Sequence, residues 1–144
     1  MIRPMEEHDA LQVQNMMRVF YHSPMVHTDG SEDIYKEDIA RCVSNDPYLE
    51  GYVFEEDGVL TGYAMVAKSF STEFGRPCMW IEDIYITETY RGCGLGQSFL
   101  EFLSRQYPNS ILRLEVEDDN THAVHVYEKS GFRVMPYKEM YKLT

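Results

Sequence analysis

The sequence predicts an α/β fold in which a mixed β-sheet is flanked by about four helices. Helical and strand-like hydrophobic patterns both occur, and they follow one another in a mixed order. A strand, a glycine-rich loop, a helix and a second strand succeed one another between residues 79 and 116, which predicts that part of the sheet is parallel. The length of 144 residues suits a single domain, 1–144, with one hydrophobic core.

The first third of the chain predicts a short strand and two helices. Residues 1–3 suit a first strand, and apolar residues recur at helical spacing over residues 6–21. Ser31 followed by two acidic residues is typical of a helix start, with the serine as N-cap. This second helix is expected to end near Ser44, before an Asn-Asp-Pro sequence.

The middle of the chain predicts a hairpin and a buried strand. Two strand-like segments, 52–54 and 59–67, flank an Asp57-Gly58 pair, which is a strong signal for a tight turn. The Gly-Arg-Pro sequence at residues 75–77 breaks the chain again. Residues 79–86 are rich in aromatic and β-branched side chains and predict a buried strand.

The last third alternates helices and strands. A Leu- and Phe-rich helix is expected over residues 95–107, and residues 111–116 alternate as a strand does. A fourth helix is expected over residues 120–130, closed by Gly131. Residues 132–143 are expected to supply one or two final strands.

Composition limits the class of protein. The formal net charge is -11, from 24 acidic and 13 basic residues, and a field of that sign repels nucleic acid and anionic membranes. The charge suits a cationic substrate, although it also serves solubility alone. There is no apolar run of membrane-spanning length and no signal-peptide pattern, and the three cysteines form no paired set. We therefore expect a cytoplasmic protein.

The clearest chemical signal is the loop Arg91-Gly92-Cys93-Gly94-Leu95-Gly96, between a strand and a helix. Glycines let backbone amides approach a ligand at a helix N-terminus, where partial positive charge favours a pyrophosphate. The alternative is a tight turn that binds nothing. The spacing Gly-x-Gly-x-Gly differs from the dinucleotide fingerprint, which weakens a dinucleotide-binding function. The lysine of a Walker loop is absent, which argues against a mononucleotide-binding module of that type.

Two motifs together resemble a known family. Arg91-x-x-Gly94-x-Gly96 matches the Arg/Gln-x-x-Gly-x-Gly/Ala signature of the GCN5-related N-acetyltransferase (GNAT) superfamily. The segment Asn120-x-x-Ala123-x-x-x-Tyr127-x-x-x-Gly131-Phe132 is similar to its second signature. Within the superfamily, residues 80–92 resemble the diamine (spermidine/spermine) acetyltransferase-like branch, which carries a Glu-Asp pair at the positions of Glu82 and Asp83.

The resemblance implies the acyl-CoA N-acyltransferase fold, with a partly splayed sheet, and acetyl-CoA as cosubstrate without a metal. It also allows a homodimer, since dimers are common among such proteins. Asn120 could instead be only a helix cap, and Lys129 only an exposed lysine. The implied acetyl-CoA contacts are Ile84, Tyr85, Ile86, Arg91, Gly92, Cys93, Gly94, Leu95, Gly96, Gln97, Asn120, Tyr127 and Lys129.

The expected reaction moves an acetyl group to a primary amine, with a small polyamine-like acceptor favoured. The amine must lose a proton before it attacks, and Glu82 is the candidate base, because a charge in an apolar strand needs a reason. The alternative is that Glu82 points to solvent or pairs with an arginine. Asp83 is a candidate for binding the ammonium group, provided that a bulge brings both carboxylates to the site.

Two further features complete the predicted mechanism. A backbone N–H near Tyr85 is expected to stabilise the oxyanion, and Tyr127 is expected to protonate the thiolate, although a helical tyrosine is often packing only. His122 and His125 are three residues apart, but no third metal ligand is evident in the sequence. Two other functions remain open, namely a protein N-terminal or lysine acetyltransferase and a non-catalytic acyl-CoA-binding domain.

Overall fold

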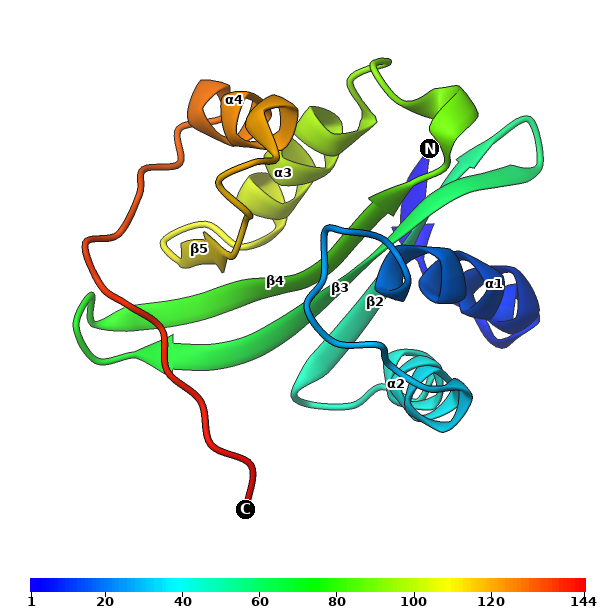
Figure 1. The fold of residues 1–144 in the computed structure, drawn as a ribbon, viewed down its shortest axis with the longest axis horizontal. Coiled ribbons are helices and arrows are strands. Elements are labelled where there is room, and N and C mark those ends of the chain that lie inside the picture. The colour runs from blue at the N-terminus through cyan, green and yellow to red at the C-terminus, as the bar shows by residue number, and fades with distance from the viewer.

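The computed structural model describes residues 1–144 and contains a five-stranded sheet between two layers of helices (Figure 1). The first four strands pair antiparallel, and the fourth pairs parallel with the fifth, which confirms the predicted mixed sheet. In sheet order, the strands are β1 (Ile2–Pro4), β2 (Leu49–Glu56), β3 (Val59–Ser71), β4 (Arg76–Ile86) and β5 (Ile111–Leu114).

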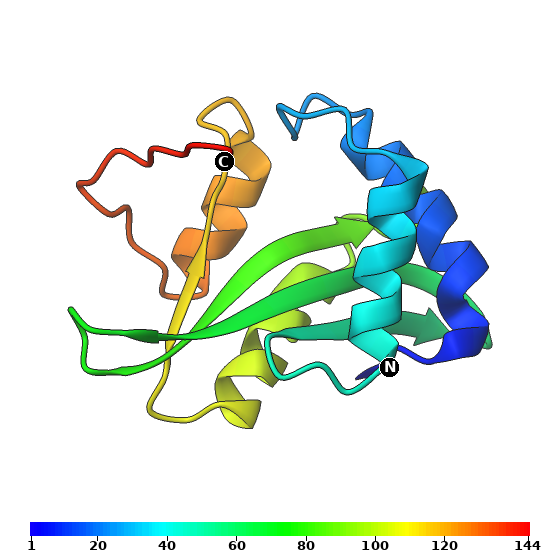
Figure 2. The same ribbon diagram turned by 90° about the horizontal axis from the view of Figure 1, so that it is seen from below.

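Four α-helices cover the sheet, two on each face. Helices α1 and α2 lie together on one face, and α3 and α4 lie on the other (Figures 1 and 2). Two short 3₁₀ turns, η1 (Glu7–Asp9) and η2 (Glu88–Tyr90), precede α1 and α3. The α-helices are α1 (Ala10–Tyr21), α2 (Glu32–Val43), α3 (Leu95–Gln106) and α4 (Thr121–Lys129).

Local sequence signals act in the N-terminal half as predicted. The Ser31 side chain accepts a hydrogen bond of 3.2 Å from the Ile34 amide, so it caps α2. Asp57 and Gly58 both have positive φ, 50° and 78°, which is the backbone of a two-residue type I′ hairpin turn between β2 and β3. These two signals confirm the predicted second helix and hairpin.

The apolar side chains form one cluster on each face of the sheet. On the α1–α2 side, the cluster includes the fully buried Val13, Met17 and Tyr63. On the α3–α4 side, Phe99, Leu100 and Leu103 pack against side chains of β2, β3 and β4. Because β3 and β4 contribute to both clusters, the centre of the sheet is covered on both faces, and its near-continuous apolar sequence follows from that position.

Strand β4 contains a β-bulge at Glu82. Met65 of β3 pairs with Asp83, whereas the next residue, Val66, pairs with Ile81, so Glu82 has no partner of its own. A bulge inserts one extra residue and redirects the neighbouring side chains. The β-bulge that the family resemblance implies is therefore present, and its unpaired residue is the first of the two carboxylates, Glu82, which precedes Asp83.

The sheet opens beyond this bulge. The parallel pairing of β4 with β5 covers only residues 78–81 of β4 and ends at Ile81 and Leu114. Beyond the bulged Glu82, residues 83–86 continue β4 and pair only with β3, so their other edge lacks a strand partner. The strand predicted over residues 111–116 accordingly ends two residues early, and the chain turns away from β4 towards α4.

The predicted final strands over residues 132–143 are not formed. The segment leaves α4 and crosses the far end of β3 and β4 without joining the sheet (Figure 1). Tyr137 donates a hydrogen bond of 2.7 Å to Glu73, at the β3–β4 turn. Val134, Met140 and Tyr141 are all more than 85% exposed, at 86%, 91% and 88%. The apolar and aromatic residues of this segment were insufficient because a strand also needs a partner ladder, and Pro136 removes one donor.

Candidate active site

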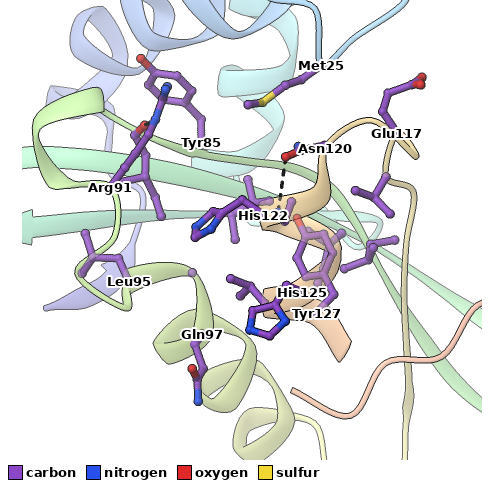
Figure 3. Close-up of a pocket in the computed structure, with 18 of the residues that line it drawn as sticks. Met25, Tyr85, Arg91, Leu95, Gln97, Glu117, Asn120, His122, His125 and Tyr127 are labelled. Carbon is purple, nitrogen blue, oxygen red and sulfur yellow. Dashed lines mark hydrogen bonds between the residues drawn. The ribbon is translucent and has the colours of Figure 1, made fainter. Parts of the chain in front are cut away.

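A cavity of about 370 Å³ opens where β4 and β5 separate. Its walls come from the second half of β4, the glycine loop and first turn of α3, the residues after β5, and one side of α4 (Figure 3). Phe20 and Met25, at and just after the end of α1, complete the wall on the opposite side. Segments that are far apart in the sequence therefore meet around one space.

Most residues predicted for the site lie on this cavity wall. Two are absent from the wall: Cys93, which is exposed on the loop, and Asp83, which is buried behind β4. The predicted residues that line the cavity are Glu82, Ile84, Tyr85, Ile86, Arg91, Gly92, Gly94, Leu95, Gly96, Gln97, Asn120, Tyr127 and Lys129.

The glycine loop ends in an open helix N-terminus. Gly94 is the N-cap of α3 with φ 81°, a left-handed conformation that favours glycine, and it offers no side chain to cap the helix. The first backbone amides of a helix have no hydrogen-bond acceptor within the helix. In α3 these amides belong to residues 94–97, which line the cavity. No atom lies within 4 Å of the place where a Cβ of Gly92 or Gly94 would stand. The arrangement is suited to an anion that approaches the backbone closely.

Arg91 connects this loop to the end of β4. Its Nε donates a hydrogen bond of 2.8 Å to the Ile86 carbonyl, and its guanidinium lies 5.6 Å from the centre of the Tyr85 ring (Figure 3). A cation over an aromatic ring is attracted by the electron-rich face. Arg91 thus supplies a positive charge beside the free edge of β4 and holds the start of the loop there.

Helix α4 is defined at both ends by residues of the second motif. The Asn120 side chain accepts a hydrogen bond of 3.4 Å from the Ala123 amide, which makes it the N-cap (Figure 3). At the other end, Gly131 has φ 94°, and the amides of Gly131 and Phe132 bond to the carbonyls of Glu128 and Tyr127. This is a Schellman motif, which explains the predicted helix end at Gly131.

The same motif positions Tyr127. The chain reversal at Gly131 places the Phe132 ring 5.9 Å from the Tyr127 ring, between centroids, and both rings pack against the α3–α4 cluster. Burial raises the pKa of the Tyr127 hydroxyl above that of an ordinary tyrosine. Tyr127 is therefore a protonated phenol on the cavity wall at neutral pH.

Glu82 projects from the bulge towards the cavity, and its side chain is exposed there. Its pKa is raised, first by partial removal from water and then by the negative charges of Asp83, Glu139 and Asp38. A carboxylate with a raised pKa is a stronger base than an ordinary glutamate. No arginine or lysine pairs with Glu82, so the alternative of a surface ion pair is not what the structure shows.

Asp83 lies on the other side of the bulge and is only 3% exposed. Its two carboxylate oxygens accept hydrogen bonds of 2.8 Å from Tyr21 and from Tyr63. Burial raises the pKa of Asp83, and the two hydroxyls oppose that rise. The expected direct contact between Asp83 and an ammonium group thus has no geometric support, because Tyr21 and Tyr63 hold this side chain away from the cavity wall.

Several wall residues were not identified in the sequence. Phe20 and Met25 have no motif, and only the packing of α1 and the following loop brings them to the cavity. Glu115 follows β5, and its pKa is raised by burial, by a hydrogen bond with Glu139 and by the charge of Glu82. The alternating pattern of residues 111–116 predicts a strand, but it does not show which of these side chains line the cavity.

The two histidines of α4 also line the cavity. His122 and His125 lie on the same wall as Tyr127 (Figure 3). The structure contains no group of three or more His, Cys, Asp or Glu side chains that could hold a metal ion. No helix combines the length and apolar character that a membrane span requires.

Comparison with known proteins places this geometry in a family. Residues 12–132 match the acetyltransferase (GNAT) family. The spermine/spermidine N(1)-acetyltransferase of Bacillus subtilis (strain 168) is 28% identical over 109 residues, covering 72% of this chain and 69% of that protein. The streptothricin acetyltransferase of Escherichia coli is 30% identical over 99 residues, covering 60% of this chain and 56% of that protein.

Solved structures share the whole fold at low sequence identity. The crystal structure of a possible acetyltransferase from Clostridium difficile 630 has a TM-score of 0.82 at 17% identity, covering 100% of this chain and 96% of that one. The structure of AAC(6')-Iy in complex with a bisubstrate analog of CoA has a TM-score of 0.79 at 15% identity, covering 100% and 97%. The family match over most of the chain, together with this fold, shows that the protein belongs to the GNAT family and is an acetyltransferase.

Proposed function

We propose that this enzyme moves the acetyl group of acetyl-CoA to a primary amine of a small, cationic, polyamine-like molecule. The observation that carries the proposal is the position of three acidic side chains, Glu82, Glu115 and Glu117, on the wall of the same cavity as the glycine loop. An ammonium group is attracted to such a wall, whereas the loop and Arg91 attract the phosphates of the cosubstrate. The cavity wall therefore carries groups that suit each of the two substrates.

The residues present fit acetyl-CoA. The open N-terminus of α3 at Gly94 and the positive charge of Arg91 suit the pyrophosphate, with Gln97, Asn120 and Lys129 as further wall residues. The free edge of residues 82–86 of β4 suits the amides of the pantetheine arm, which would add to the sheet as a strand does. The backbone N–H groups of Ile84 and Ile86 are the proposed donors to the oxyanion, in place of that of Tyr85, because the Thr87–Thr61 hydrogen bond and the strand register turn the Tyr85 N–H towards β3.

The proposed chemistry is direct attack within a ternary complex. Glu82 accepts a proton from the ammonium group, directly or through a water, and the free amine nitrogen forms a bond to the acetyl carbonyl carbon. The carbon–sulfur bond then breaks, and Tyr127 gives its proton to the departing thiolate. The raised pKa of each group suits its role, since Glu82 becomes the stronger base and Tyr127 stays protonated at neutral pH.

The choice of a small acceptor is supported by the relatives. Their names include acetyltransferases of spermine and spermidine, of streptothricin and of L-ornithine, all of which are small amines. The identities of 28–30% are too low to carry a substrate from those proteins to this one. The acidic wall is the feature of this chain that favours a molecule with more than one positive charge.

A panel of amines tests the proposal. Release of free CoA thiol from acetyl-CoA would be followed with spermidine, a diamine, an amino acid, an aminoglycoside and a lysine peptide. We expect spermidine or the diamine to have the highest kcat/KM, and raised ionic strength to increase their KM because the acidic wall is screened. A preference for the lysine peptide would instead assign the enzyme to protein substrates.

A further inference from the structure

Three buried or half-buried side chains meet behind the cavity wall. Tyr21 is the last residue of α1, Tyr63 lies on β3, and Asp83 follows the bulge of β4. The Tyr21 hydroxyl donates to one oxygen of Asp83 and the Tyr63 hydroxyl donates to the other, both at 2.8 Å. We refer to these three residues as the Asp83 clamp.

The clamp satisfies a group that is costly to bury. A carboxylate removed from water needs hydrogen-bond donors, and bonds to an ionised oxygen are stronger than bonds between neutral groups. Asp83 forms no salt bridge, so the two phenols are its only side-chain partners. No cation lies among the other ionisable groups near it, which are Glu82, Asp38, Tyr35 and Cys42.

Each side of the clamp is adjacent in sequence to a residue of the cavity wall. Phe20 precedes Tyr21 and lines the cavity, where its ring makes edge contacts with Tyr63 and Tyr85 at centroid distances of 6.5 and 6.2 Å. Glu82 precedes Asp83 and is the bulged residue that faces the cavity. The hydrogen bonds of the clamp therefore connect the chain segments that carry these two wall residues.

We propose that Asp83 is a positioning residue of the acceptor site, which holds the end of α1 against the bulge of β4 and so sets Phe20 relative to Glu82. This inference rests on the proposed function, because it assumes that Glu82 faces the amine. Asp83 touches neither substrate. It acts through Tyr21 on one side of the cavity and through the backbone of the bulge on the other.

The charge of Asp83 adds a second, separable effect. A negative charge next to Glu82 opposes ionisation of Glu82, and so raises its pKa. Asp83→Asn keeps the shape of the side chain and removes this charge. The acid limb of the pH profile of kcat/KM should therefore move to lower pH in this variant, whereas a role in packing alone would leave the limb in place.

The test compares Tyr21→Phe with a matched control, Tyr52→Phe. Tyr52 is also a buried tyrosine that donates to a carboxylate, Glu50, at 2.6 Å, but it does not line the cavity. With the best amine of the panel, we expect Tyr21→Phe to raise the KM for the amine about tenfold, because the end of α1 loses its hydrogen bond to the charged Asp83 and no longer holds Phe20 in place. The KM for acetyl-CoA should stay unchanged in both variants, and the amine KM should stay unchanged in Tyr52→Phe.

Two results would overturn the inference. One is an amine KM that is equal in Tyr21→Phe and Tyr52→Phe, together with an unmoved acid limb in Asp83→Asn. The other is an equal rise of both substrates' KM values, which would show general loosening of the fold. Hydrogen exchange gives a readout without turnover, and residues 16–23 should exchange faster in Tyr21→Phe and Asp83→Asn than in Tyr52→Phe.

The same set of measurements separates this inference from the proposed function. If the wild-type enzyme acetylates no amine in the panel, the proposed function fails, and the exchange rates of residues 16–23 alone decide whether the clamp holds α1. If the wild-type enzyme is active but the variants behave like Tyr52→Phe in every measurement, the clamp fails and the proposed function stands.

Discussion

Burial raises the pKa of both Tyr127 and Glu82, and it does so with opposite consequences for catalysis. A tyrosine with a raised pKa keeps its proton at neutral pH, so the proton is present when the thiolate departs. A glutamate with a raised pKa accepts a proton more readily. The proposed acid and base are different residue types, but removal from water raises the pKa of both.

Substitution of Tyr127 by phenylalanine tests the proposed acid. The change removes only the hydroxyl, so the contact with Phe132 and the helix end are preserved. We expect kcat to fall about 100-fold, in the range usual for general acid catalysis, while the dissociation constant of acetyl-CoA changes little. The comparison of thiol release with calorimetric binding measures both, and an unchanged kcat would remove Tyr127 from the mechanism.

Substitution of Glu82 by glutamine tests the proposed base. The raised pKa of Glu82 means that the wild-type rate should rise with pH as this carboxylate ionises. In Glu82→Gln that limb should disappear, and kcat/KM at neutral pH should fall about 100-fold. Activity should recover only at high pH, where free amine is abundant. A wild-type-like acid limb in the variant would assign the proton transfer to another group.

At the scale of single elements, the start of α3 depends on backbone conformation more than on side chains. Gly94 adopts φ 81° and has no side chain to cap the first amides of α3. A Cβ added at Gly96 would lie 3.8 Å from the Cδ1 atom of Ile86, an ordinary van der Waals contact. A residue with a Cβ is strained in a left-handed conformation. The loop sequence therefore determines both the turn and the open helix end.

Gly94→Ala should weaken acetyl-CoA binding. The strain of roughly 1–2 kcal/mol would be relieved by movement of the loop, and the dissociation constant for acetyl-CoA should rise about tenfold. The matched control is Gly58→Ala in the β2–β3 turn, which has a similar φ of 78° and lies outside the cavity. Both variants should lose thermal stability, but only Gly94→Ala should bind acetyl-CoA more weakly. Equal binding in the two would show that the loop does not hold the cosubstrate.

Acidic side chains from different parts of the molecule lie close enough to affect one another's pKa. Asp38 of α2 is half-buried, and burial together with the charges of Asp83 and Glu37 raises its pKa to about 6. Such a group binds its proton more tightly in the folded chain than in the unfolded one. The stability that it contributes is greatest at low pH and is lost as pH rises through its folded pKa.

Asp38→Asn should therefore stabilise the protein at neutral pH. Between about pH 4 and pH 6 the wild type should lose on the order of 1–2 kcal/mol because of this group, and the variant should not. Thermal unfolding at pH 7 and at pH 4 provides the measurement, with Asp118→Asn in an exposed loop as the control. A gain in melting temperature that is equal at both pH values would exclude ionisation of Asp38 as its cause.

The elements that could be predicted from the sequence are those with strong local signals. Ser31, Asp57-Gly58 and Gly131 act through bonds to near neighbours or through their own φ, so their effects do not depend on the rest of the fold. The final strands could not be predicted in the same way. Residues 132–143 contain apolar and aromatic side chains, but a strand forms only beside a partner, and this segment pairs with no strand of the sheet.

The sequence alone was enough to indicate an acetyltransferase, because the glycine loop and the helix end at Gly131 belong to two local motifs that resemble that family. The tertiary structure alone decided which side chains share the cavity. The bulge at Glu82 sends Glu82 to the cavity and Asp83 to Tyr21 and Tyr63, and the packing of α1 brings Phe20 to the opposite wall. Those outcomes depend on strand register and helix packing between distant residues, which no local pattern encodes.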